Sequence, residues 1–140
     1  MNRKWMAVAV AALAVSGWQL AAQVSKGKTR ALETKTWMKT VNGPHCSAAA
    51  KMLKGAPADD KEWSDLVTHG QMLSEAGHVL MADGRCPDKA WADASKQLQD
   101  GGAALAAAAA AKNVDEAKAA LNNSVLASCK GCHSVHRVKK

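Results

Sequence analysis

The chain has 140 residues, of which 22% are charged, and it carries a net charge of +7. This length is sufficient for one domain with a single hydrophobic core. The basic residues are scattered and no nucleic-acid-binding motif accompanies them, so we expect no nucleic-acid partner.

The N-terminal segment is typical of an export signal. Arg3 and Lys4 form a positively charged start, and an apolar stretch follows over residues 6–15. A membrane anchor would need about 20 mostly apolar residues, and polar residues interrupt this run before that length is reached. We therefore predict a signal peptide over residues 1–22 and an exported, periplasmic domain over residues 23–140, bound to a membrane only if the signal stays uncleaved. Loss of Arg3 and Lys4 would lower the net charge from +7 to +5.

The rest of the chain predicts helices, because apolar residues recur with a period near 3.6 and strand-forming runs are absent. The expected helices cover about residues 34–55, 59–81, 91–111 and 113–136. Gly43 and Pro44 should kink the first helix. Residues 83–87 form a turn, and Asn113 followed by Glu116 resembles a capping box at the start of the last helix.

Four helices joined by short turns predict an all-α, antiparallel up-down-up-down four-helix bundle. After residue 22 the only aromatic residues are Trp37, Trp63 and Trp91, and the helix faces are rich in alanine and glycine. Such a bundle either packs its helices very closely or encloses a bulky apolar group.

The stretch Cys129-Lys130-Gly131-Cys132-His133 carries the strongest chemical signal. This spacing is compatible with covalent haem attachment, half of a zinc site, or a dithiol redox pair. A redox pair is expected in a βαβ setting, which is missing here. Structural zinc needs four ligands, so a zinc-stabilised helical bundle is a distant alternative. Haem attachment explains all three side chains, since two thiols bond to the porphyrin and the following His133 binds iron as the proximal ligand.

The motif lies at the end of four helices, with Arg137 four residues after His133. This arrangement resembles the class II c-type cytochromes, the cytochrome c prime superfamily, over about residues 30–138. The resemblance implies one covalently bound haem c with its iron, a contact of Arg137 with a propionate or the proximal side, and often a homodimer. His136 departs from the family pattern, where many members carry Phe or Tyr.

The resemblance implies two alternative functions. Six-coordinate members use a methionine of the first helix as a second iron ligand and transfer electrons, whereas five-coordinate members bind nitric oxide or carbon monoxide. Met38 lies on the inward-facing stripe and is the candidate distal iron ligand, although counting without gaps reaches Lys39, and His45 is another candidate. We expect one-electron transfer without enzymatic activity, gas binding being the alternative. A basic surface would suit acidic redox partner proteins.

Two cysteines and two histidines remain. Cys46 and Cys86 are a candidate disulfide in an exported protein, the alternative being a free thiol at Cys46. His69 and His78 are expected on the surface or edge of the second helix.

Overall fold

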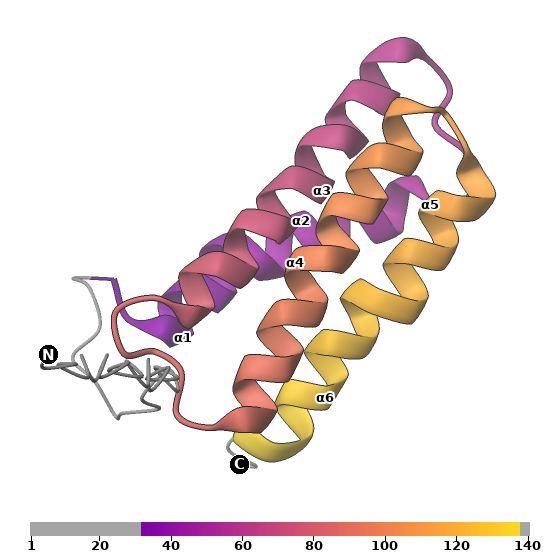
Figure 1. Cartoon of the computed structure of the whole chain (residues 1–140). Coiled ribbons are helices and arrows are strands. Elements are labelled where there is room, and N and C mark those ends of the chain that lie inside the picture. Colours follow the sequence, from indigo (N-terminus) through magenta and orange to yellow (C-terminus); the bar gives the residue numbers. More distant parts are fainter. Residues whose placement is uncertain (1–31, 138–140) are drawn as a thin grey trace, which may run out of the picture.

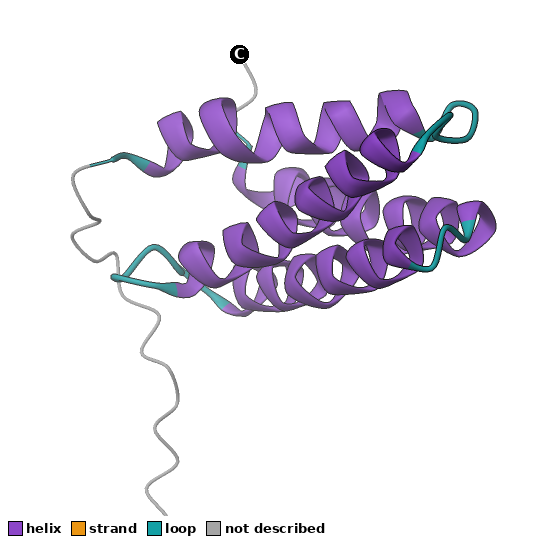
Figure 2. Cartoon of the chain, turned by 90° about the horizontal axis from the view of Figure 1, so that it is seen from above, coloured by secondary structure: helices purple, strands orange, loops and turns teal. Residues whose placement is uncertain are grey.

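The computed structural model describes residues 32–137, so the predicted signal peptide over residues 1–22 lies outside it. This part of the chain contains helices and no strand, as Figure 2 shows, which confirms the all-α expectation. None of its helices is both long and apolar enough to cross a membrane. The elements are α1 (Thr34–Trp37), the π-helix η1 (Met38–Asn42), α2 (Gly43–Met52), α3 (Asp60–Met81), α4 (Lys89–Ala110), α5 (Val114–Ala120), the π-helix η2 (Leu121–Leu126) and α6 (Ala127–His136).

These elements form four long helical segments that fit the expected bundle. α1, η1 and α2 follow one another without a break, and so do α5, η2 and α6. α3 and α4 lie side by side, the α5–η2–α6 segment runs along α4, and α1–η1–α2 packs on α3 (Figure 1). The first and last segments also approach each other, through α2 and η2.

Three helices begin directly after a capping residue, and of these residues Asn113 was expected from the sequence. In each, the side-chain oxygen of the capping residue accepts the backbone N–H three positions later: Asp59 from Glu62 at 2.8 Å, Asp88 from Trp91 at 2.9 Å, and Asn113 from Glu116 at 3.2 Å. The capping box expected at Asn113 is only half formed. The backbone N–H of Asn113 donates to the carbonyl of Ala108 instead of the Glu116 side chain.

The disruption expected at Gly43–Pro44 takes the form of the π-helix η1, which directly precedes these residues. Proline lacks a backbone N–H and crowds the carbonyl four residues earlier in an α-helix. The N–H of Gly43 donates to Met38, five residues back, so the helix widens by one residue and continues. The helix therefore passes the proline without ending.

Close backbone contact between α3 and α4 explains the many small residues in this bundle. A Cβ atom added at Gly70 would lie 2.6 Å from the backbone nitrogen of Ala106, and one at Gly102 would overlap the backbone nitrogen of Ser74. The largest fully buried side chains, Leu66, Leu73, Leu105 and Val125, complete the core. Close packing is thus realised along this helix pair.

We predict that Gly102→Ala destabilises the protein. Alanine improves helix propensity by up to about 1 kcal/mol, but here the new methyl group meets the backbone of α3, and overpacking of this kind costs about 1–3 kcal/mol or more. The free energy of unfolding in urea measures the balance. Gly131→Ala is the matched control, because an added Cβ there has nothing within 4 Å. An equal or higher stability of Gly102→Ala would contradict the close contact.

Candidate functional site

A cavity of about 220 Å³ lies between the first and last helical segments and is closed by α3 and α4. Its lining includes Met38 of η1 and Cys129, Cys132 and His133 of α6. The structure thus brings together four of the five residues that the sequence singles out. The fifth, Arg137, is an exposed residue at the end of α6 and is not part of the lining.

The three motif residues lie on α6, whose helical spacing turns them toward the same space. Cys132 is only 8% exposed, Cys129 is half-buried and His133 is exposed. Burial, followed by the charge of Cys129, raises the pKa of the Cys132 thiol. The two thiols therefore differ in chemical character although they share one helix.

Met38 is the first-helix candidate that reaches the cavity. It packs against the core from η1, while Lys39 is exposed and neither Lys39 nor His45 lines the cavity. The one-residue difference between Met38 and the ungapped count to Lys39 falls within η1, whose turn holds one residue more than an α-helical turn.

The Cys46 thiol of α2 lies against the Cys129 thiol of α6, and both residues line the cavity. Its hydrogen bond lowers the pKa of Cys129 to about 7, even though burial opposes this, and the same pairing raises the pKa of Cys46. Cys86 lies elsewhere, and its thiol donates to the backbone carbonyl of Asp88 at 3.4 Å. All four cysteines are free. The Cys46–Cys86 disulfide considered from the sequence is therefore not formed, and Cys46 is a free thiol.

The described residues offer no ready zinc site. Between residues 32 and 137, no three His, Cys, Asp or Glu side chains converge so that they could hold one metal ion. Structural zinc takes four such ligands, whereas haem iron needs one or two axial side chains, the porphyrin supplying the rest. The observed grouping of two thiols, one imidazole and one thioether fits haem better than zinc.

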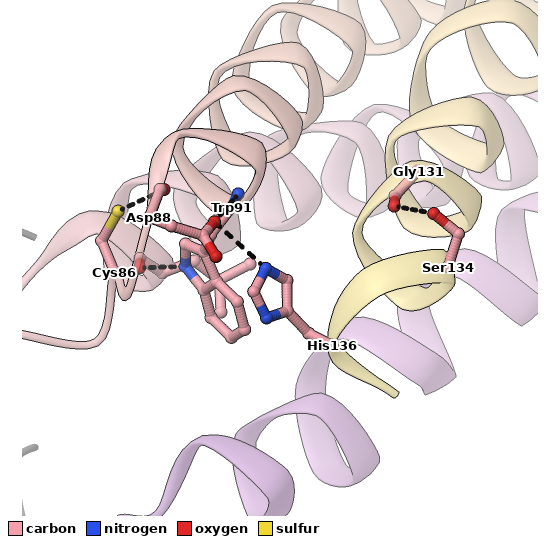
Figure 3. Close-up of polar contacts among 7 residues, drawn as sticks. Cys86, Asp88, Trp91, Gly131, Ser134 and His136 are labelled. Atoms are coloured by element: carbon pink, nitrogen blue, oxygen red, sulfur yellow. Dashed lines mark hydrogen bonds and ion pairs between the residues drawn. The ribbon is translucent and has the colours of Figure 1, made fainter. Parts of the chain in front are cut away.

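His136 anchors the end of α6 to the start of α4, as Figure 3 shows. Its Nε2 lies 3.2 Å from Oδ1 of Asp88, and its ring meets Trp91 edge-on with 5.3 Å between ring centres. The Trp91 indole N–H donates to the carbonyl of Leu80 at 2.8 Å. The backbone N–H of Trp91 and then the charge of His136 lower the pKa of Asp88. This contact holds the motif helix in place and was not foreseen from the sequence.

Two further histidines join α2 to α3. The Nδ1 atoms of His45 and His69 are 2.9 Å apart, so one ring donates and the other accepts. Burial, followed by the nearby His45 ring, lowers the pKa of His69. His69 is thus a half-buried contact, in contrast to His78, which is exposed as expected.

Asn42 is a cavity residue that the sequence analysis missed. It ends η1, is 7% exposed and lines the cavity, and its buried Oδ1 atom has no hydrogen-bond partner among the described residues. A polar residue four positions after Met38 on the same helix face is the signal that could have identified it.

The residues present fit a covalently bound haem in their chemistry. Thiols three residues apart, an adjacent imidazole and an opposing thioether are the side chains that c-type attachment and axial ligation use. The leucines Leu80 and Leu98 supply apolar walls. Comparison of the chain with family models, curated proteins and solved structures finds no match.

We predict that Cys46→Ala slows the alkylation of Cys129 in protein that carries no haem. At pH 7 a thiol with a pKa of about 7 is half ionised, and a return to the ordinary value of about 8.5 would lower the reaction rate roughly tenfold. Iodoacetamide labelling followed by peptide mass spectrometry measures the rate. Cys86→Ala is the control and should leave the Cys129 rate unchanged. Equal rates in Cys46→Ala and the parent would argue against the thiol contact.

We predict that acid weakens the packing of α2 on α3. Because the folded pKa of His69 lies below its unfolded value of about 6.5, the folded state binds fewer protons, and stability is lost as the pH falls below that value. The loss should be under about 1 kcal/mol, since solvent screens a half-buried ring. Urea unfolding at pH 7.5 and 5.5 should show a smaller pH effect in His69→Gln than in the parent. His78→Gln should show the same pH effect on stability as the parent. If His69→Gln also shows the parent's pH effect, the loss of stability in acid does not come from His69.

Proposed function

We propose that this chain is an exported, periplasmic monohaem c-type cytochrome that transfers one electron at a time. The supporting observation is that Met38, Cys129, Cys132 and His133 line one cavity. Cys129 and Cys132 would hold the haem, His133 would bind its iron on one side, and the Met38 sulfur would be the second protein ligand. Haem c supplies a reversible one-electron couple between ferric and ferrous iron.

The side chains around the cavity have defined tasks in this proposal. A thioether ligand favours the reduced iron and raises the reduction potential. Leu80 and Leu98 would give the haem apolar contacts, and the contact of His136 with Asp88 fixes the end of the helix that carries His133. In this proposal the protein is an electron carrier and not an enzyme, so no side chain has to make or break a substrate bond.

The exposed surface near the motif favours an acidic redox partner. Lys130 and Arg137 are both exposed, one within the motif and one at the end of α6. Positive charge at this position would orient a partner protein with a negative surface toward the cavity and speed the encounter. Arg137 is in addition the residue proposed to contact a haem propionate. The resemblance to class II cytochromes also suggests a homodimer.

We predict that the purified protein carries one covalent haem and that Met38→Ala changes its spectrum. Intact mass spectrometry should show the mass of one added haem, retained after denaturation, and lost when Cys129 and Cys132 are both replaced by serine. The parent spectrum should be low-spin with a sulfur-to-iron band at its red end, and Met38→Ala should be high-spin without that band.

Met52→Ala is the control, because this half-buried methionine does not line the cavity and should leave the spectrum unchanged. A parent without covalent haem would refute the cytochrome assignment. A high-spin parent that is unaffected by Met38→Ala and binds carbon monoxide would instead establish the five-coordinate, gas-binding alternative.

A further inference from the structure

Cys46 is a third thiol in the cavity, and it contacts one of the two thiols proposed to hold the haem. Cys46 of α2 and Cys129 of α6 both line the cavity, both are half-buried, and a hydrogen bond joins their side chains. The packing of α2 against η2 brings the two cysteines together across the bundle, although they are far apart in the sequence. The function proposed above uses Cys129 and leaves Cys46 without a task.

The other two cysteines are less suited to react with Cys46. The thiol of Cys86 contacts the backbone carbonyl of Asp88, and Cys86 does not line the cavity. Cys132 lines the cavity but is only 8% exposed, so an oxidant reaches it less easily. A disulfide bond is about 2.05 Å long and forms between cysteines that already lie close together. Cys46 and Cys129 are therefore the pair that the fold prepares for this bond.

We propose that Cys46 and Cys129 form a reversible disulfide in the haem-free protein, and that this bond must be reduced before haem is attached. The disulfide follows from the thiol contact alone, whereas its effect on haem attachment rests on the function proposed above. An exported chain meets disulfide oxidants, because disulfides form and persist outside the cytoplasm. The bond connects the first and last helical segments, and it protects the Cys129 thiolate from oxidation to a sulfinic or sulfonic acid.

Thiol–disulfide exchange forms this bond in two steps. The Cys129 thiolate attacks one sulfur of a disulfide oxidant, which gives a mixed disulfide and releases the other half of the oxidant as a thiolate. The hydrogen bond from Cys46 favours this first step, since it lowers the pKa of Cys129 to about 7. Cys46 then loses its proton and attacks the Cys129 sulfur, which expels the second half of the oxidant. Two protein thiols are thereby oxidised to one disulfide, and the oxidant is reduced to two thiols that take up the two protons.

The test treats the haem-free chain with glutathione disulfide, blocks the remaining thiols and maps the bonds by peptide mass spectrometry. Trypsin cleaves after Lys130 and so separates Cys129 from Cys132, while Cys46 lies in a third peptide. The Cys46 and Cys129 peptides should be joined, and the intact chain should lose the mass of two hydrogen atoms. Iodoacetamide should then label neither Cys46 nor Cys129, and dithiothreitol should restore the labelling of both.

Two controls show whether the folded contact selects this pair of cysteines. Cys86→Ala should form the same bond as the parent, because Cys86 lies away from the cavity. In guanidinium chloride the contact is lost, and a short loop closes at a lower entropy cost than a long one. The bond between Cys129 and Cys132 should therefore replace the bond between Cys46 and Cys129 in the unfolded chain.

The effect on haem attachment is measured by adding ferrous haem to the reduced and to the disulfide-bonded chain. Addition to a vinyl group of the haem needs a free thiol. The disulfide-bonded chain should therefore lose the haem bond at Cys129 that the reduced chain forms, and prior treatment with dithiothreitol should restore it.

The outcomes separate this inference from the function proposed above. Exported protein without covalent haem would overturn that function and the effect on attachment, but not the disulfide. A folded chain that links Cys129 to Cys132, or that carries only glutathione on its cysteines, would overturn the disulfide and leave the function intact. If the oxidised and reduced chains bond haem at Cys129 equally fast, the disulfide does not control attachment.

Discussion

The arrangement of the bundle depends on the backbone contact between α3 and α4. Gly70 and Gly102 leave so little space that a single methyl group at either position would collide with the backbone of the facing helix. The two helices therefore form a thin, stiff layer, against which the first and last segments pack. Gly77 repeats the contact nearer the turn that joins them, where an added Cβ would lie 2.7 Å from the Ser95 carbonyl. The cavity is lined on this side by the larger Leu80 of α3 and Leu98 of α4.

The helices, and the position of the motif residues on one helix, could be predicted because both depend on local signals. Caps such as Asp59 and Asn113 act on N–H groups three residues away, and the Cys129–His133 spacing places its side chains on one helix. The periodicity also turns Met38 inward without reference to any other segment. Signals of this kind can be recognised from one amino-acid sequence, because they involve residues only a few positions apart.

Contacts between distant segments could not be predicted in the same way. Periodicity assigns a residue to a face but does not name the residue opposite. His45 and His69 are 24 positions apart, and His136 and Asp88 are 48 apart. Cys46 was matched with Cys86 because both were left over, whereas the fold turns it toward Cys129. Asn42 was missed because a polar residue is assigned to the exposed side by its type, although its spacing from Met38 places it on the inward face.

The two π-helices determine how a change in chain length would alter the lining of the cavity. Each precedes one of the helices that line the cavity, η1 before α2 and η2 before α6. A π-helical turn holds one residue more than an α-helical turn, and one residue corresponds to about 100° of rotation about the helix axis. Deletion of a single residue from η1 would therefore rotate the helix before it, Met38 included, relative to the cavity. A one-codon deletion or insertion in η1 would therefore change which side chain faces the cavity, while the helices that follow η1 keep their register.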